Sequence, residues 1–500
     1  MSINKTFFQP LDRVAIALML ILSILIAILV LQGDAVKPMV RQFSWQNQKI
    51  STDDISFALT FSRPMNQKSV EENLTIEPPL AGKVSWAGRR MVYTLLTPAP
   101  YGTNYTVKLQ DATDKFAEKE GKKREMQPFT GTFRTRDRVL LYIGADKKDT
   151  GKLILYNLTK EQKKVLTPKD LVVMDYEPFP SGDKIMFSAR ASTSQDLLSS
   201  QVYTVTTGIA VKAGEPAEPP GRIDLLLDNK EYQNLKFDLS PDGETLVIQR
   251  GKRNDPSDFG LWFMSVNTKE SGEKPLPKRL KTQPVGDFII TPDSKAVAVA
   301  QGQGAAILPL QTDASKPLDF LPQFGLVQAF SKDGSQAAMV KFNTDYTRDL
   351  FLVTNQGTQR QLLRTTGTIL QCQFDNASPT LYCLLTQLLE AEYYQEQPYL
   401  LAINLKDGQQ KPLLLLPPDQ RNMEMSLAPD GLGLLFDQVV PQTTVTKGTP
   451  TNILTTEDGQ TISTSNLWLM PLVPFSDPTA EEQIQPEQLP LVGFHPSWLP

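Results

Sequence analysis

The sequence predicts an all-β protein: a β-propeller that follows a small β-sandwich and a single N-terminal transmembrane helix. A recurring Pro/Asp/Gly turn leading into an apolar run predicts the propeller, because this is the chemistry of a β-hairpin. Repeats of about 40–50 residues with four strands each are typical of propeller blades. The copies begin as FPSGDKIMFSA at Phe179, LSPDGETLVIQ at Leu239, TPDSKAVAVA at Thr291, FSKDGSQAAMV at Phe330 and LAPDGLGLLF at Leu427.

Composition agrees with a large, turn-rich β protein. The chain has 500 residues, 40% of them hydrophobic, with 38 prolines and 29 glycines. That length exceeds one domain and suits a propeller with a smaller module. The formal net charge of −4 argues against nucleic acid as a partner.

The N-terminal segment contains a long apolar run. Residues 14–31 read VAIALMLILSILIAILVL, with Ser23 as the only polar side chain. At about 1.5 Å per residue this run nearly crosses a ~30 Å hydrocarbon core. We therefore predict a tail over residues 1–13 and an uncleaved transmembrane signal anchor over 14–32, with a cleaved signal peptide and a buried core helix as alternatives. The predicted protein is single-pass, with a cytoplasmic N-terminus and periplasmic or otherwise extracytoplasmic C-terminal domains.

Residues 38–136 form the first predicted folded domain. Alternating runs over 55–62, 73–78, 82–88, 90–98, 104–112 and 129–135 predict a small antiparallel sandwich. The segments FSRPMN at Phe61, SVEENLTIEP at Ser69 and TPAPYGTNYTVKL at Thr97 resemble the bacterial Ig-like domain of S-layer and other envelope proteins. The resemblance implies a spacer or adhesion module without catalytic residues.

Residues 139–500 form the predicted propeller. Three strands over 139–146, 151–158 and 163–167 lack a first partner, while LVGFHPSWLP at 491–500 reads as a first strand that ends where its turn should come. A C-terminal strand that completes the first blade would close the ring and protect its edges. Seven blades follow, or six if 139–167 forms no blade. LKFDLSPDGETLVIQR at 235–250 and FGLWFMSVNT at 259–268 resemble the TolB-like or WD-like propellers of the bacterial envelope.

Loops between second and third strands should all lie on one face of the propeller. They are long at 191–200, 251–258, 343–349, 387–398 and 438–465. Loop elaboration on one face is typical of a binding surface, and Tyr and Arg are frequent anchors of protein interfaces. The predicted partner-binding residues are Arg250, Lys252, Arg253, Asp255, Asp258, Tyr346, Arg348, Tyr393 and Tyr394.

The two cysteines, Cys372 and Cys383, flank a turn at Asn376–Pro379. If a hairpin closes there, the thiols face each other on neighbouring strands, close to disulfide range. Two readings stay open: a disulfide in an exported domain, or two reduced buried thiols.

No catalytic motif is found. The single histidine, His495, cannot build a three-ligand zinc site or a two-histidine relay, and we expect it to be structural. The acidic residues show no diagnostic spacing. We therefore predict no catalytic residue, no metal and no cofactor.

Two functions from different classes follow. The preferred hypothesis is a membrane-anchored, non-enzymatic scaffold that holds a protein partner of the envelope on the looped propeller face. The alternative is an envelope sensor or enzyme that binds a glycan or small molecule in the propeller channel. Carboxylates or aromatic rings converging on that channel would favour the alternative, and an apolar, Tyr/Arg-rich rim would favour the scaffold.

Overall fold

The computed structural model describes most of the chain. The described residues are 10–32, 37–115, 125–194, 196–210, 216–267, 275–282, 286–302, 304–311, 319–390, 394–418, 420, 422–441, 462–473 and 485–500. The chain divides into two compact units. Unit 1 comprises Met1–Gln48, Ile55–Leu96 and Asn104–Phe133, and unit 2 comprises Lys49–Asp54, Thr97–Thr103 and Arg134–Pro500.

The transmembrane part of the predicted fold class is wrong. Within the described residues, no helix combines the length and the hydropathy that crossing a membrane requires. The first helix is α1 (Pro10–Gln32). The prediction was based on the apolar run of the sequence at residues 14–31.

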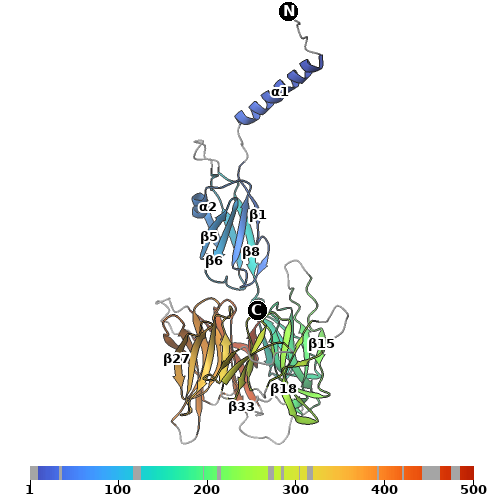
Figure 1. Cartoon of the computed structure of the whole chain (residues 1–500), viewed down its shortest axis with the longest axis vertical. Helices are drawn as coiled ribbons and strands as arrows, with labels where there is room; N and C mark the ends of the chain where they lie inside the picture. Colours follow the sequence, from blue (N-terminus) through green and yellow to red (C-terminus); the bar gives the residue numbers. More distant parts are fainter. Residues whose placement is uncertain are drawn as a thin grey trace, which may run out of the picture. The chain divides into compact units, whose positions relative to one another are not determined.

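Two four-stranded sheets form the N-terminal sandwich (Figure 1). Aromatic side chains pack between them: Phe43 of the first sheet lies 6.3 Å from Phe133 of the second in an edge-on arrangement, measured between ring centroids. Within the second sheet Phe133 stacks on Tyr105 at 5.0 Å. The first sheet has the order β1 (Val40–Phe43), β3 (Ser56–Phe61), β6 (Arg90–Leu95), β5 (Gly82–Ala87). The second has the order β2 (Lys49–Ile50), β8 (Phe129–Thr135), β7 (Asn104–Leu109), β4 (Leu74–Glu77).

A short helix in this sandwich was not predicted. It is α2 (Gln67–Asn73), and the Asn66 side chain caps it by accepting a hydrogen bond from the Ser69 amide at 3.2 Å. Val70 is its buried residue. Sequence patterns assigned no secondary structure to residues 67–72.

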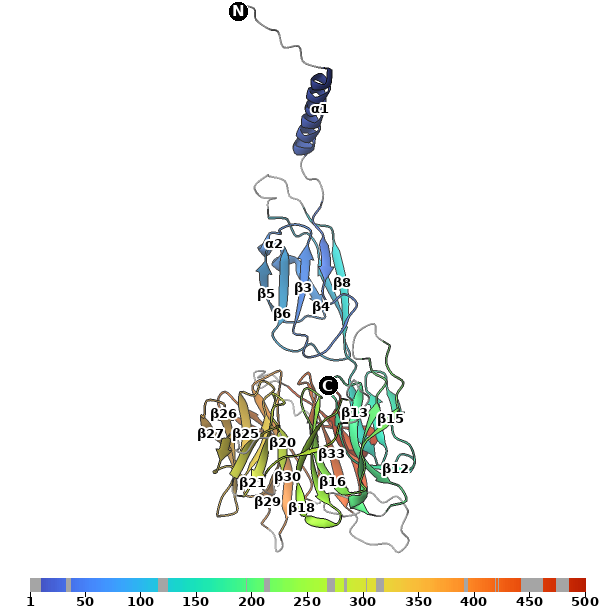
Figure 2. The same cartoon turned by 45° about the vertical axis from the view of Figure 1, so that its right-hand side comes forward.

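Unit 2 is a β-propeller, and this part of the prediction is confirmed. Figures 1 and 2 show its sheets side by side. Five sheets have four antiparallel strands in chain order. They are β12 (Leu171–Pro178), β13 (Lys184–Ala191), β14 (Gln201–Thr206), β15 (Ile223–Leu227); β16 (Tyr232–Leu239), β17 (Thr245–Lys252), β18 (Asp255–Ser265), β19 (Lys278–Arg279); β20 (Phe288–Ile290), β21 (Ala296–Gln301), β22 (Gly304–Pro309), β23 (Asp319–Leu321); β24 (Leu326–Phe330), β25 (Gln336–Phe342), β26 (Arg348–Thr354), β27 (Gln359–Thr365); and β28 (Ile369–Phe374), β29 (Thr380–Leu388), β30 (Glu396–Asn404), β31 (Gln410–Leu415).

The last strand, β35 (Glu487–Trp498), joins two further blades into one sheet. Its first part pairs with β34 (Ile462–Pro471), next to β33 (Gly433–Pro441) and β32 (Met425–Leu427). Its second part pairs with β9 (Val139–Gly144), next to β10 (Leu153–Asn157) and β11 (Gln162–Val165). With β35 counted in both, the described residues give seven four-stranded blades. The ring therefore closes through non-covalent pairing of the two ends of unit 2.

The recurring turns explain why the hairpins form where they do. In the second of them, the Ser240 hydroxyl donates to Asp242 Oδ1 at 2.5 Å and accepts from the Thr245 amide at 2.8 Å. Gly243 follows with a φ of 73°, a conformation that glycine adopts without strain. Ser294 takes the same place in the next copy with a φ of 60°, so the turn survives in a copy that lacks the glycine.

The first strands of the blades meet around the axis. β16 contacts β20, β20 contacts β24, β24 contacts β28, β28 contacts β32, and β32 contacts β35. Polar side chains link these inner strands: Gln373 Oε1 accepts from the Leu427 amide at 2.7 Å, and Ser426 Oγ accepts from the Trp498 amide at 3.0 Å. Residues on the inner strands therefore line the axial channel.

Candidate functional site

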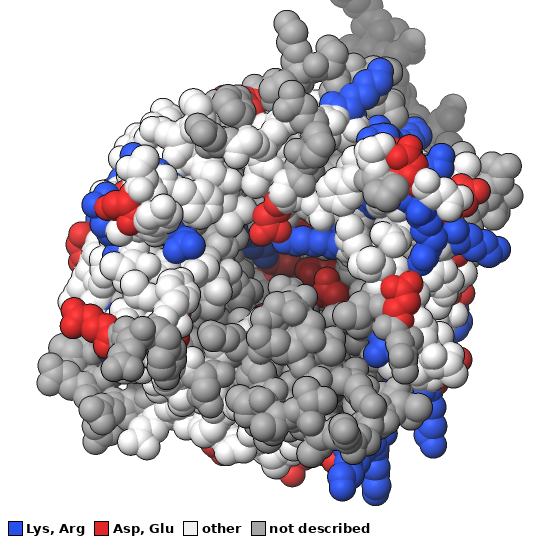
Figure 3. All heavy atoms as spheres, turned by 90° about the horizontal axis from the view of Figure 1, so that it is seen from below, with Lys and Arg blue, Asp and Glu red and all other residues white. Residues whose placement is uncertain are grey.

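Acidic side chains and one histidine converge on the axial channel. They come from inner strands and their neighbours in three parts of the ring. We define the axial cluster as Asp175 and Glu177 of β12, Asp238 of β16, Glu424 just before β32, Asp437 of β33 and His495 of β35. The face of unit 2 seen in Figure 3 has a hollow, and acidic and basic side chains are visible inside it.

His495 lies at the centre of the axial cluster. Its Nε2 is 3.1 Å from Glu424 Oε2 and 3.6 Å from Asp175 Oδ1. Its ring centroid lies 4.8 Å from that of Tyr176, whose hydroxyl donates to the His495 carbonyl at 2.5 Å. His495 also has a φ of 55°, within the left-handed region that non-glycine residues seldom adopt. The backbone of the closing strand thus holds the imidazole between two carboxylates from different blades.

Asp437 is the fully buried member of the cluster. Its carboxylate accepts the Glu424 amide at 2.8 Å and the His495 amide at 2.7 Å. The pKa of Asp437 is raised to about 7; burial is the largest cause and the charge of Glu424 adds to it, while the two amides and His495 oppose the rise. Asp437 therefore ties β35 to β32 and titrates near neutral pH.

Asp238 and Glu177 occupy matching places: each is the penultimate residue of its inner strand, before the turn. Asp238 Oδ2 accepts the Ile290 amide of the next blade at 2.7 Å, and burial raises the pKa of Asp238 to about 6. For Glu177 the structure has no hydrogen bond or ion pair to a described residue, although protein surrounds it and solvent reaches it. Partial loss of hydration to the surrounding protein, followed by the charges of Asp238 and Asp175, raises the pKa of Glu177. Its carboxyl group is available to a molecule in the channel.

No metal site is found in the described part of the chain. No group of three His, Cys, Asp or Glu side chains there has an arrangement that could hold a metal ion. The axial cluster can instead accept and donate hydrogen bonds and exchange protons near neutral pH. These are the capacities of a site for a small polar molecule.

The structure separates the residues predicted to bind a partner. Arg250 is 8% exposed, and its guanidinium lies 4.5 Å from the centre of the Tyr232 ring. Its Nε donates to Asn234 Oδ1 at 3.1 Å. Arg250 is therefore part of the packing between β16 and β17 and is not a surface anchor. The predicted loop at 251–258 is mostly strand, because β17 and β18 pair as far as Lys252 and Asp255.

Three more of the predicted residues form hydrogen bonds or ion pairs with other residues of the propeller. Arg253 Nε donates to the Asn229 carbonyl at 2.7 Å, Asp258 forms an ion pair with Arg279, and Arg348 donates to the Gly367 carbonyl at 2.5 Å. Their polar groups hold neighbouring loops and strands together.

Of the remaining five predicted residues, the four that the structure describes differ in their contacts and exposure. Lys252 is exposed at the end of β17, and the exposed Asp255 accepts a hydrogen bond from the Ser257 amide at 3.1 Å. Tyr346 is 88% exposed and Tyr394 is 74% exposed. The Tyr394 hydroxyl donates a hydrogen bond to Glu396 Oε1. Tyr393 lies outside the described residues. Of the eight described residues, Lys252, Asp255, Tyr346 and Tyr394 are therefore the exposed ones.

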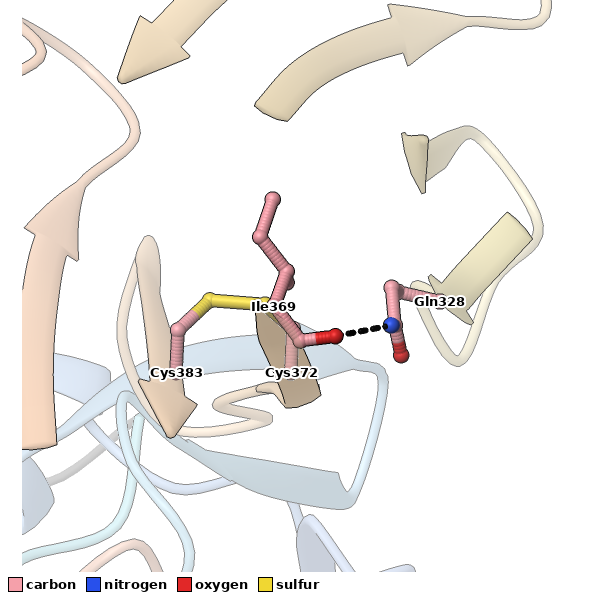
Figure 4. The surroundings of a disulfide bond; sticks show 4 residues. All are labelled: Gln328, Ile369, Cys372 and Cys383. Atoms are coloured by element: carbon pink, nitrogen blue, oxygen red, sulfur yellow. Dashed lines mark hydrogen bonds between the residues drawn. A yellow bond between two sulfur atoms is a disulfide. The ribbon is translucent and has the colours of Figure 1, made fainter. Parts of the chain in front are cut away.

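Cys372 and Cys383 form a disulfide between β28 and β29 (Figure 4). The two residues are directly opposite in the register, with Cα atoms 4.2 Å apart, and both side chains are buried. Next to the bond, Gln328 Nε2 donates to the Ile369 carbonyl at 2.9 Å and links β24 to β28 (Figure 4). The disulfide therefore lies in the core between two blades.

Loss of the disulfide should destabilise unit 2. The bond spans eleven residues in sequence, and closing a loop of that size in the unfolded chain contributes about 3 kcal/mol of stability. We expect reduction, and the double substitution C372A/C383A, each to lower the free energy of unfolding by about 2–3 kcal/mol in a denaturant titration. The double variant should then be insensitive to reductant. A native protein that reductant leaves unchanged would contradict this.

Sequence reasoning missed the axial cluster. A signal was present, because acidic residues recur just before the turns: Glu177 before Pro180, Asp238 before Pro241 and Glu424 before Pro429. On an inner strand these places lie beside the axis. The lone histidine was read as structural, and its contacts with Glu424 and Asp175 were not anticipated.

Comparisons with known proteins add structural similarities but no family. No family model matches the chain, and no curated protein sequence matches it significantly. Similar solved structures include TolB from Acinetobacter baumannii, with 12% identity and a TM-score of 0.37 over 68% of this chain and 79% of that one. They also include the periplasmic gluconolactonase of Pseudomonas aeruginosa, with 12% identity and a TM-score of 0.42 over 73% of this chain and 99% of that one. An oligogalacturonate lyase from Vibrio parahaemolyticus has 13% identity and a TM-score of 0.42 over 60% of this chain and 88% of that one. At this level of similarity we derive neither activity nor ligand from them.

Proposed function

We propose that unit 2 is a ligand-binding propeller whose axial channel holds a small polar molecule, such as a saccharide or a charged metabolite. The observation that carries this proposal is the convergence of carboxylates from β12 and the β32–β33 region on His495 of the closing strand. The same feature distinguishes the alternative hypothesis from the preferred one in the sequence analysis. Glu177, without a partner among the described residues, is the group that we assign to ligand contact.

A protein partner on the loop face is the second candidate. Tyr346 and Tyr394 favour it, because both are large, amphipathic and strongly exposed. Against it, Arg250, Arg253 and Arg348 are used in contacts within the propeller. The axial site is therefore the better supported of the two.

We further propose that the protein works outside the cytoplasm. The two cysteines of the chain are joined in a disulfide and no free thiol remains. Disulfides persist in oxidising compartments and are rare in the cytosol. In this proposal the N-terminal sandwich is an Ig-like spacer without catalytic residues, which its two packed four-stranded sheets support.

A thermal-shift screen tests the axial site. The full-length protein is screened against neutral saccharides, acidic sugars, amino acids and polyamines, and the affinity of each hit is measured by calorimetry. We expect Glu177→Gln to weaken binding at least about tenfold, which corresponds to roughly 1.4 kcal/mol, a typical value for the loss of one hydrogen bond. Chromatography of each hit after incubation with the protein would show whether the protein converts the bound molecule.

Matched variants separate this site from other surfaces. Glu244→Gln makes the same substitution at an exposed position beside a turn and should leave the affinity unchanged. Y346S/Y394S should also leave it unchanged. Hits that bind Glu177→Gln as tightly as the parent would contradict the axial site, and hits lost only in Y346S/Y394S would favour the loop face.

A further inference from the structure

A second pocket lies away from the axis, between the β16–β19 blade and the β20–β23 blade. Its volume is about 1000 Å³, at the upper end of the range of small-molecule sites. One side is formed by β17, β18 and β19, and the other by the turn at Thr291–Lys295 and the residues after β22. The Ser294 hydroxyl accepts the Asp242 amide at 3.2 Å and so joins the turns of the two blades beside the pocket.

The floor of the pocket is apolar. Phe263 and Leu310 are half-buried and pack against the core shared by these two blades, which includes Val247 and Val299. Leu276 also lines the pocket, and its side chain is 80% exposed. A bound apolar group would remove all three side chains from water, which favours binding by about 25 cal/mol per Å² of buried surface.

The charged groups of the lining have a single sign. Lys278 and Lys295 line the pocket, and no Asp or Glu does so among the described residues. Neither ammonium group forms an ion pair within 4 Å with a described carboxylate. Lys278 stands opposite Phe263 in the register of β19 and β18, and the Lys295 carbonyl accepts the Leu310 amide at 2.9 Å. Each lysine thus neighbours one residue of the apolar floor.

We propose that this pocket binds a molecule with an apolar body and one anionic group, such as an aromatic carboxylate. The body would lie on Phe263, Leu310 and Leu276, and the carboxylate would lie between the Lys278 and Lys295 ammonium groups. The site is independent of the axial cluster, because its residues belong to outer strands and to turns.

Calorimetric titration of the full-length protein with 2-naphthoate tests the proposal. We expect saturable binding below 1 mM, at least about tenfold tighter than that of 2-naphthylmethylammonium, which has a similar body and the opposite charge. The substitutions K278E/K295E should weaken naphthoate binding at least about tenfold, and Leu276→Ser should weaken it about threefold to fivefold. Any non-specific binding of the naphthyl ring to the exposed apolar side chains of α1 would be the same in all variants.

A matched charge variant makes the test decisive. K164E/K411E makes the same change of net charge at two exposed lysines of β11 and β31, and it should bind naphthoate as the parent does. Unfolding temperatures of all variants are measured to show that each is folded. Absence of saturable binding, equal binding of the cation, or an equal loss in K164E/K411E would overturn the proposal.

Discussion

Replacement of Trp498 by alanine should lower the free energy of unfolding of unit 2 by about 3–5 kcal/mol, the usual cost of emptying a buried tryptophan site. Trp498 is 5% exposed and packs with Leu140, Leu435 and Leu467, which come from both blades that β35 joins. Its amide also donates to Ser426 Oγ at 3.0 Å. The cavity would therefore open at the seam where the ring closes.

Denaturant titration followed by circular dichroism measures this effect. Trp498→Phe keeps most of the apolar volume and should lose much less stability. Tyr346→Ala, at an 88% exposed position, should stay within about 0.5 kcal/mol of the parent. A loss below 1 kcal/mol in Trp498→Ala would show that β35 does not hold the ring closed.

Asp437 should make the stability of unit 2 fall as the pH rises from about 4 to 7. The pKa of Asp437 is about 7 in the folded state, against an ordinary value of 3.8. Between these values the folded protein binds a proton that the unfolded chain has released, so the stability contributed at low pH is lost as the pH rises through 7. Over the whole range the difference corresponds to roughly 4 kcal/mol from this one group, and less of it falls between two measured pH values inside the range.

Asp437→Asn should remove this part of the pH dependence. The amide oxygen still accepts one backbone amide, and the group no longer titrates. Free energies of unfolding measured at pH 4.5 and 7.5 should differ by roughly 2–4 kcal/mol less in this variant than in the parent. Glu487→Gln, at an exposed position of β35, is the control and should keep the parental slope. An identical slope in Asp437→Asn would contradict the assignment.

The turns could be predicted from sequence because their chemistry is local. The Ser240 hydroxyl bonds to Asp242 and to the Thr245 amide, and Gly243 adopts the positive φ that the turn needs. All these groups lie within six residues, so the motif predicts a hairpin wherever it occurs. Repetition of hairpins then predicts a propeller. The helix α2 was missed because seven residues are too few for a clear periodic pattern, and its only strong signal is the Asn66 cap.

The axial cluster could not be predicted because it depends on long-range pairing. Asp175 and His495 are separated by 320 positions in the chain and meet only when β35 enters the ring. Arg250 was misplaced for a local reason: the hydrophilic run after it was taken as a loop, whereas β17 continues to Lys252 and Arg250 packs on Tyr232. Sequence patterns therefore predicted the scaffold better than the site.

A crystal structure of the full-length protein with the tightest-binding hit of the ligand screen tests the central claim most directly. We predict electron density for the molecule in the axial channel, within hydrogen-bonding distance of the Glu177 carboxyl group. Density for the molecule on the loop face or elsewhere, with the channel occupied only by water, would contradict the proposed function.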